Sequence, residues 1–282
     1  MAGTLYLVGT PIGNLGDLSP RAVETLQSVD FIAAEDTRVT LKLLNRFGIK
    51  KPMVSYYEHN RAEMGEKLLS RLLDGESCAL VTDAGMPAIS DPGEDIVRQC
   101  AAQGVTVCAV PGPCALVTAL ALSGLPTQRF CFEGFLSVTA KNRREHLESL
   151  KGETRTMIFY EAPHKLLRTL ADLLEYLGDR EVAVCRELTK LHEEILRTTF
   201  SAALSHFNSP ETPPRGEFVL VVAGTREAEA PVMDAAAALA LVRRLRGEEG
   251  KGLKEACRLA AADSGYTRNE LYRLAVLAEE NQ

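Results

Sequence analysis

The chain has 282 residues, of which 46% are hydrophobic and 25% are charged, and its formal net charge is −6. This length predicts two domains with room for a small extra one, and the composition is typical of a soluble globular protein. No apolar run is long enough to span a bilayer, so we expect no membrane attachment. The negative net charge excludes a general attraction to nucleic acid. Because the first residues enter a strand-like run without a basic region, we expect no secretory signal.

Cysteine and histidine usage points to a reducing compartment. The seven cysteines lie mostly inside apolar segments, and no two of them form a Cys-x-x-Cys pair. The five histidines are scattered without metal-ligand spacing. These patterns indicate buried thiols, with neither disulfides nor a zinc site. We therefore expect a cytoplasmic protein without a metal.

Strands and helices alternate over the first part of the chain. Helical signals separate the strands, as where Ser19 provides an N-cap and Pro20 follows it at the first helical position. This alternation predicts an α/β domain over residues 1–114, with a mostly parallel sheet and helices on both faces. The expected strands are residues 4–9, 31–34, 53–56, 78–81 and 105–110.

The remainder of the chain predicts a second α/β domain and a helical tail. An apolar helix at 115–122 opens the second domain, residues 115–224, whose tighter strand spacing predicts a mixed sheet. Residues 225–232, rich in Glu, Ala and Pro, predict a linker. The tail, 233–282, can be a helix-turn-helix or a plain helical hairpin. The expected strands are 129–135, 156–160, 181–188, 193–199 and 217–223, and the expected tail helices are 235–245, 253–263 and 268–279.

Three loops rich in proline and glycine follow expected strands, beginning after Gly9, Thr82 and Val110. In an open α/β sheet, ligands bind in the crevice outside the carboxyl ends of the strands. The glycine spacing matches neither the dinucleotide fingerprint nor a Walker A loop. We expect a crevice lined by backbone, whose only charges are Asp17, Asp83 and Asp91. Such a crevice suits an adenosine-like or zwitterionic ligand better than a polyphosphate.

A basic stripe is expected on the helix that ends near Phe47. Arg38, Lys42, Arg46 and Lys50 recur at steps of four, and no acidic residue occurs between Asp36 and Glu58. Leu41, Leu44 and Phe47 form another face of this helix. Unpaired cations in this arrangement suit a phosphate backbone, although the spacing taken alone is more often that of a solvated surface. Weaker basic segments contain Lys141, Arg143 and Arg144, and Arg243, Arg244, Arg246, Lys251 and Lys254.

Six ordered motifs extend across the first two domains. They are LVGTPIGNL at 7–15, AEDTR at 34–38, DAGMPAISDPG at 83–93, VPGP at 110–113, FYEAPH at 159–164 and RELTK at 186–190. Each motif is weak alone, but the set is specific, and from about residue 3 to 224 the chain resembles a known family, the bacterial small-subunit rRNA (cytidine-2′-O)-methyltransferases of the tetrapyrrole methylase superfamily. Small departures from the family pattern at Thr82, Met86, Cys114 and Lys165 leave the expected chemistry unchanged.

The resemblance implies a fold, a cofactor and partners. The fold is two α/β domains with S-adenosylmethionine in the cleft between them, plus a small C-terminal helical domain. The implied reaction is 2′-O-methylation of a cytidine ribose in the decoding region of 16S rRNA, free or in the small ribosomal subunit, by a homodimer. The implied cofactor-binding residues are Pro11, Gly13, Asp83, Ala84, Gly85, Pro87, Pro111, Gly112, Pro113 and Ala162.

Polar residues at strand ends beside this cleft are the candidates for chemistry. A ribose hydroxyl is a poor nucleophile, so a general base or a cation that stabilises the oxyanion is expected. The candidate bases are Asp36, Glu35 and Glu187, while Arg38 and Lys190 can orient the ribose or phosphate. The expected RNA-binding residues are Arg38, Lys42, Arg46, Lys50, Lys141, Arg143 and Arg144.

Two other functions stay open at this point. One is a methylase of the same superfamily that acts on a tetrapyrrole or another small molecule, which would need neither the basic stripe nor the helical tail. The other is a non-catalytic ribosome-binding module with vestigial loops. The intact glycines and prolines of all three loops argue against that alternative.

Overall fold

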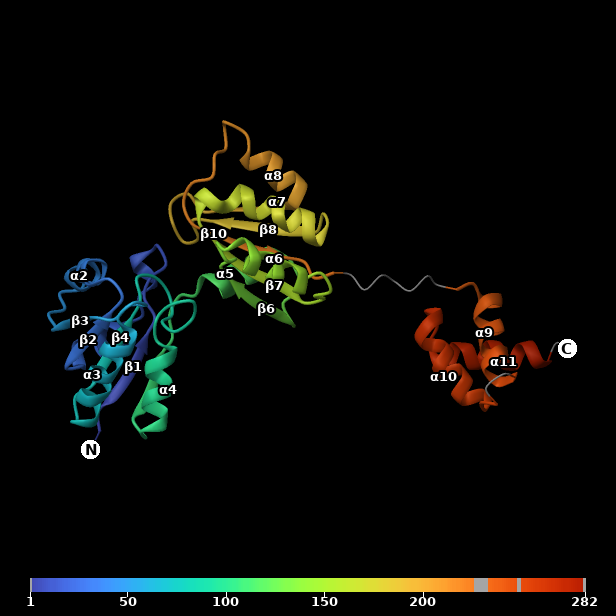
Figure 1. Ribbon diagram of the computed structural model, residues 1–282, viewed down its shortest axis with the longest axis horizontal. Coiled ribbons are helices and arrows are strands. Elements are labelled where there is room, and N and C mark those ends of the chain that lie inside the picture. The colour runs from blue at the N-terminus through green and yellow to red at the C-terminus, as the bar shows by residue number, and fades with distance from the viewer. Residues whose placement is uncertain (1, 226–232, 248–249, 281–282) are drawn as a thin grey trace. The chain divides into compact units, whose positions relative to one another are not determined.

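The computed structural model describes residues 2–225, 233–247 and 250–280, and the chain forms two compact units (Figure 1). Met1–Gly224 is the α/β unit, and Thr225–Gln282 is the helical unit. Apart from Thr225, the linker expected at 225–232 lies outside the described residues. Within the described ranges, no helix combines the length and apolar character needed to cross a membrane.

The first sheet of the α/β unit is entirely parallel, where a mostly parallel sheet was predicted. Its strands lie in the order β3-β2-β4-β1-β5. Because all of them are parallel, each strand ends at the same edge of the sheet. The strands are β1 (Thr4–Val8), β2 (Phe31–Ala34), β3 (Met53–Ser55), β4 (Cys78–Val81) and β5 (Thr106–Val110). The helices are α1 (Pro20–Ser28), α2 (Thr37–Arg46), α3 (Arg61–Leu73) and α4 (Glu94–Ala102), with a short 3-10 helix η1 (Leu15–Asp17).

Both faces of this sheet are buried, because successive residues of β2 point to opposite sides. Ile32 packs with Leu26 and Leu44 of α1 and α2. Phe31 packs on the other face with the buried side chains of α3 and α4. A continuous apolar run is the expected sequence for a parallel strand that is covered on both faces.

The second sheet of the α/β unit is mixed, as predicted. Its order is β6-β7-β10-β8-β9, in which β6 and β7 are parallel and the other pairs are antiparallel. The strands are β6 (Phe130–Gly134), β7 (Thr156–Glu161), β8 (Glu181–Arg186), β9 (Glu194–Thr199) and β10 (Phe218–Val222). The helices are α5 (Ala115–Ser123), α6 (Ala140–Ser149), α7 (Leu166–Leu177) and α8 (Phe200–Phe207), with a 3-10 turn η2 (Pro163–Lys165).

The sequence did not predict α6 and α8. Only Arg143 and Leu147 are buried on α6, so this helix lacks the apolar stripe that identifies a helix from sequence. α8 follows β9 directly, without a Gly or Pro between them. The sequence therefore gives no signal for the change from strand to helix.

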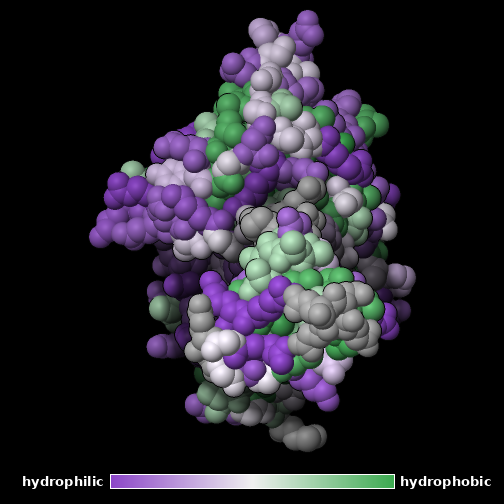
Figure 2. All heavy atoms as spheres, turned by 90° about the vertical axis from the view of Figure 1, so that its right-hand side faces the viewer, coloured by the Kyte–Doolittle hydropathy of each residue, from purple (hydrophilic) through white to green (hydrophobic). Residues whose placement is uncertain are grey.

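The helical unit contains α9 (Ala235–Gly247), α10 (Leu253–Ser264) and α11 (Arg268–Glu280), in agreement with the predicted tail. Val242, Cys257 and Leu271 pack together in its core. At the start of α11, the amide of Glu270 donates to the Thr267 hydroxyl and the amide of Thr267 donates to the Glu270 carboxylate, which forms a capping box. In Figure 2, hydrophilic and hydrophobic side chains interleave over the surface that faces the viewer.

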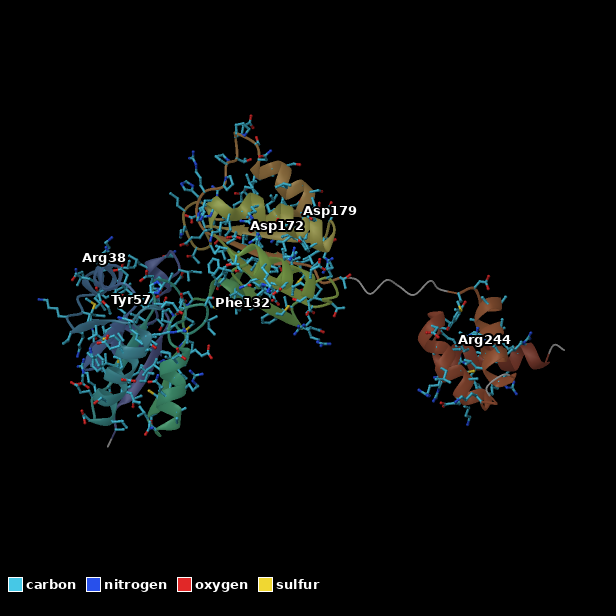
Figure 3. All side chains as sticks on the ribbon, viewed as in Figure 1. Arg38, Tyr57, Phe132, Asp172, Asp179 and Arg244 are labelled. Carbon is cyan, nitrogen blue, oxygen red and sulfur yellow. The ribbon has the colours of Figure 1, made fainter. Side chains whose placement is uncertain are left out.

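Arg143 is a buried structural residue of α6, and its burial argues against the predicted contact with RNA. Its side chain is buried, and its guanidinium donates to Asp172 Oδ2 at 2.6 Å and to Thr169 Oγ1 at 2.8 Å. Figure 3 shows Asp172 on α7, the helix whose apolar side chains pack in one cluster with those of α6. Arg143 therefore joins two helices and is not available to a phosphate.

Replacing Arg143 should destabilise the α/β unit, whereas replacing its neighbour should not. Arg143→Ala leaves Asp172 without its buried partner, so we expect a loss of roughly 3 kcal/mol in the free energy of unfolding. Arg144 is exposed, and Arg144→Ala should change that free energy by less than about 0.5 kcal/mol. Urea unfolding followed by circular dichroism measures both values. Equal losses in the two variants would contradict the structural role of Arg143.

Candidate functional site

The three proline- and glycine-rich loops meet at the carboxyl edge of the first sheet, as predicted. Thr10 and Gly85 exchange two backbone hydrogen bonds of 2.9 and 3.1 Å, which join the loops after β1 and β4. The loop after β5 packs directly on the first loop, because a Cβ atom at Gly9 would lie only 2.7 Å from Gly112 Cα. Glycine at both positions permits this close approach of two backbones.

The converged loops contact the second sheet through an apolar residue. Ile12 of the loop after β1 is buried in the same cluster as Leu116 of α5 and Leu188. This packing fixes the loops against the second sheet, so both sheets contribute to the adjoining site.

A main cavity of about 400 Å³ lies at this junction, a volume in the range of small-molecule sites. The loops after β2 and β4 line it from the first sheet, and residues of β7, β8 and β10 line it from the second. Its lining residues are Ile12, Glu35, Thr82, Asp83, Ala84, Gly85, Met86, Ile89, Ser90, Asp91, Cys114, Ala115, Phe135, Tyr160, Glu161, Ala162, Pro163, Cys185, Leu188, Glu217, Phe218 and Val219.

The charges of the main cavity are all negative. Among the described residues that line it, none is Lys, Arg or His, and five are acidic. The expectation of a nearly uncharged crevice was therefore only partly correct. Asp83 and Asp91 line it as predicted and Asp17 does not, while Glu35, Glu161 and Glu217 add carboxyl groups. A ligand with positive charge suits this cavity, and a polyphosphate does not.

Hydrogen bonds give the carboxyl groups different environments. Glu35 Oε2 accepts from the Thr82 hydroxyl at 2.6 Å and from the Asp83 amide at 3.4 Å. Asp83 Oδ1 accepts from the Asp36 amide at 3.1 Å. Burial, together with the charge of Glu35, raises the pKa of Asp83 above its usual value. Burial and the charge of Glu35 also raise the pKa of Asp91, to about 7.

The predicted cofactor-binding residues fall into three groups. Asp83, Ala84, Gly85 and Ala162 line the main cavity. Pro11 lines a small cavity of about 230 Å³ beside it, together with Lys42 and Asp83. The remaining residues support the loops without lining either cavity; they are Gly13, Pro87, Pro111, Gly112 and Pro113.

Asp36 is held by a cation. It caps α2 by accepting from the Arg38 amide at 2.8 Å, and its carboxylate forms an ion pair with the Arg38 guanidinium at 2.5 Å. These hydrogen bonds from Arg38 lower the pKa of Asp36 to about 2. Asp36 is also absent from the described residues that line the main cavity, so the structure places it beside the site and not in it.

Glu187 and Lys190 form an ion pair, with Nζ to Oε1 at 2.8 Å, and Lys190 also contacts Glu217 at 2.8 Å. Burial favours a higher pKa for Glu187, but hydrogen bonds from Lys190 and from the Glu217 amide outweigh burial and lower the pKa. Glu187 has a φ of 51°, in the left-handed region. Glu217, and not Glu187, is the member of this group that lines the main cavity.

The basic stripe lies at the surface. Arg38, Lys42, Arg46 and Lys50 are all exposed, and Figure 3 shows Arg38 on α2 at the outside of the first sheet's helices. Leu44 is buried beneath the stripe, but Leu41 is 46% exposed, so the opposite face of α2 is narrower than predicted. Lys141 and Arg144 are exposed on α6, whereas Arg143 is buried.

The sequence analysis missed residues contributed by the second sheet. Phe218 begins β10 and Glu217 directly precedes it, and β10 runs antiparallel to β7 and β8. The amino end of β10 therefore lies beside the carboxyl ends of its neighbours. A search limited to carboxyl ends of strands cannot find such residues. Tyr160 and Asp91 were within recognised motifs, and only the cavity shows that they face the site.

Comparison with known proteins agrees with this architecture. The family model described as Tetrapyrrole (Corrin/Porphyrin) Methylases matches residues 4–204. The crystal structure of uroporphyrin-III-C-methyltransferase from Thermus thermophilus superposes with a TM-score of 0.56 at 19% identity, covering 78% of this chain and 94% of that one. This likeness concerns the fold.

Close relatives carry one name. A Ribosomal RNA small subunit methyltransferase I from Synechocystis sp. is 49% identical over 280 residues, covering 98% of this chain and 99% of the relative. One from Thermotoga maritima is 51% identical over 222 residues, covering 79% of this chain and 99% of the relative. The chain thus belongs to the tetrapyrrole methylase family, within the group of its relatives named ribosomal RNA small subunit methyltransferase I.

Proposed function

We propose that this protein transfers a methyl group from S-adenosylmethionine to the ribose 2′-hydroxyl of a cytidine in the decoding region of 16S rRNA. The observation that carries the proposal is the main cavity, which the three converged loops and the second sheet enclose. The names of the relatives identify the class of substrate. The reaction places the protein in the cytoplasm, and the family resemblance implies a homodimer.

The chemistry of the main cavity fits S-adenosylmethionine. This ligand carries positive charges on its sulfonium and ammonium groups, and Glu35, Asp83 and Asp91 offer carboxyl groups from the first sheet. The second sheet contributes apolar residues such as Ala162 and Val219, which suit an adenosine. The lack of cations in the described lining disfavours a nucleoside triphosphate. Asp83, Ala84, Gly85 and Ala162 would hold the ligand directly.

When bound, S-adenosylmethionine supplies a methyl group on a sulfonium that is a good leaving group. The chain must supply alignment, exclusion of water and an acceptor for the hydroxyl proton. Of the three candidate bases, only Glu35 lines the main cavity, while Asp36 and Glu187 are each held by a cation. Asp36 then orients Arg38, and Lys190 packs against Gly13 as a support for the first loop.

The α/β unit should suffice for the methyl transfer. The Thermotoga maritima relative is matched over 222 residues, which are 99% of its length. That length is close to the α/β unit, Met1–Gly224. The Synechocystis relative, in contrast, matches 98% of this chain. In the helical unit, the exposed Arg243 and Arg244 suit an auxiliary contact with RNA.

The direct experiment is methyl transfer to purified small ribosomal subunits. The subunits are taken from cells that lack the matching methylation and are incubated with the full chain and labelled S-adenosylmethionine. Nuclease digestion should recover the label on one cytidine 2′-oxygen. Label on a tetrapyrrole such as uroporphyrinogen instead of rRNA would favour the small-molecule methylase. A chain that binds S-adenosylmethionine but labels neither substrate would also count against the proposal.

The basic stripe predicts a specific salt dependence. Neither Lys42 nor Arg46 forms an ion pair within the described part of the chain. The binding constant for the small subunit falls as salt rises. Lys42→Ala/Arg46→Ala should make the slope of its logarithm against the logarithm of the salt concentration less steep by about 2, because two phosphate contacts are lost. Filter binding at several salt concentrations measures this slope.

The control for the stripe removes two exposed lysines that are already paired. Lys67 contacts Glu63 at 2.6 Å, and Lys151 contacts Glu148 at 2.6 Å. Lys67→Ala/Lys151→Ala makes the same change in net charge away from α2. It should leave the slope unchanged. An equal fall in slope for both double variants would show that net charge, and not the stripe, governs the binding.

A further inference from the structure

A second polar cavity adjoins the main cavity. This side cavity has a volume of about 380 Å³ and lies between the segment that joins β3 to α3 and the loop that leads from β4 into α4. Glu58 and Arg61 line it on one side, and Glu94 and Asp95 line it on the other. Its volume falls in the range of sites that hold a small molecule or a nucleoside.

Three residues, Glu35, Ser90 and Asp91, line both the main cavity and the side cavity. A general base must reach the hydroxyl whose proton it takes, and the oxygen of that hydroxyl must also reach the methyl group that it attacks. The shared wall between the two cavities is therefore the place where such a group is required.

The loop that carries Asp91 has an unusual backbone. Ala88 and Ser90 have φ angles of 68° and 63°, in the left-handed region that residues with a side chain rarely adopt. Gly93, with a φ of 147°, ends the loop where α4 begins. A strained backbone persists only where the surrounding structure holds it. Here it places Ser90 and Asp91 on the shared wall.

Asp91 and Glu35 contact the same hydroxyl group, that of Thr82. The hydroxyl can donate only one hydrogen bond, and Glu35 accepts it. Asp91 is half-buried beside a second carboxylate, so it retains a proton more readily than an exposed aspartate. Burial and the charge of Glu35 raise the pKa of Asp91 to about 7, where a general base works best at neutral pH.

We propose that the Asp91 carboxylate is the group that accepts the proton of the ribose 2′-hydroxyl, with the target nucleoside held in the side cavity. This inference rests on the proposed methyl transfer. A neutral nucleoside suits the acidic side cavity better than a phosphate. The Glu58 carboxylate forms an ion pair with Arg61 at 3.1 Å and keeps lone pairs that can accept from the N4 amino group of cytosine.

The proposed step balances in atoms and charge. The O2′–H bond breaks and its proton moves to Asp91. The bond from O2′ to the methyl carbon forms while the bond from that carbon to sulfur breaks, and its electron pair stays on sulfur. The products are the methylated ribose and S-adenosylhomocysteine. Asp91 then releases the proton to water.

The other carboxyl groups are occupied by hydrogen-bond donors. Asp36 is paired with Arg38, and Glu187 with Lys190. Asp83 accepts the Asp36 amide, and Glu35 accepts from Thr82 and the Asp83 amide. The charged and titratable groups that line the two cavities with Asp91 are Glu35, Asp83, Tyr160, Glu161, Glu217, Cys114, Cys185, Glu58, Arg61, Glu94 and Asp95.

The kinetic test compares single-turnover methylation between pH 5.5 and 8.5. In the wild-type chain the rate should rise about tenfold per pH unit and level off below pH 7, because the bound sulfonium lowers the pKa of Asp91 from its ligand-free value of about 7. Asp91→Asn should lower the plateau roughly 100-fold and remove this pH dependence. Asp91→Glu should retain the pH dependence with a smaller loss. Glu66→Gln, an exposed carboxyl on α3, should match the wild type.

A second measurement does not depend on turnover. A cation bound beside Asp91 favours its ionised form. Binding of S-adenosylmethionine to the wild-type chain near pH 7 should therefore release protons, seen by calorimetry in buffers of different ionisation enthalpy. S-adenosylhomocysteine lacks the sulfonium charge and should release fewer. The Asp91→Asn variant should still bind S-adenosylmethionine, but the two ligands should then release equal numbers of protons.

The outcomes separate this inference from the proposed function. An Asp91→Asn variant that keeps the wild-type rate and pH dependence would overturn the role of Asp91 while the methyl transfer stands. Equal proton release by wild type and Asp91→Asn would also overturn it. A wild-type chain that binds no S-adenosylmethionine would remove the proposed function itself, and the inference with it. Loss of rate and pH dependence in Asp91→Asn, with binding retained, supports it.

Discussion

The contact between the backbones of Gly9 and Gly112 is the constraint on which the site depends. A Cβ atom at Gly112 would lie 2.9 Å from the backbone of Gly9, so neither loop tolerates a side chain there. This contact places the loop after β5 on the loop after β1, and hydrogen bonds between Thr10 and Gly85 add the loop after β4. Ile12 then joins the assembled loops to the second sheet, because its side chain is buried in the apolar cluster of that sheet.

Charge is divided between the interior and the surface of this unit. The described lining of the main cavity contains carboxyl groups without cations, whereas α2 presents Arg38, Lys42 and Arg46 to solvent. The neighbours of each carboxyl group then set its pKa. Arg38 lowers the pKa of Asp36 to about 2, and burial beside Glu35 raises that of Asp91 to about 7. One short stretch of sheet edge thus holds one permanent anion and one group that can exchange a proton at neutral pH.

Much of the fold was predictable from the sequence, because apolar runs between glycine-rich turns are strong local signals. The ten strands, the parallel first sheet and the convergence of the three loops follow from such signals. Two helices did not: α6 has no apolar stripe, and α8 follows β9 without a break. Contacts between residues far apart in the sequence could not be predicted either. The burial of Arg143 requires Asp172 on another helix, and Glu217 reaches the main cavity only because β10 is antiparallel.

Binding of S-adenosylmethionine to Gly112→Ala tests the central claim most directly, since this residue supports the main cavity without lining it. The added Cβ must push the loops apart, so titration calorimetry should show the affinity falling roughly tenfold or more. Gly152→Ala is the matched control, because a Cβ there meets nothing within 4 Å. Its affinity should equal that of the wild type. Wild-type affinity in Gly112→Ala would contradict the claim that the close contact of these loops forms the ligand site.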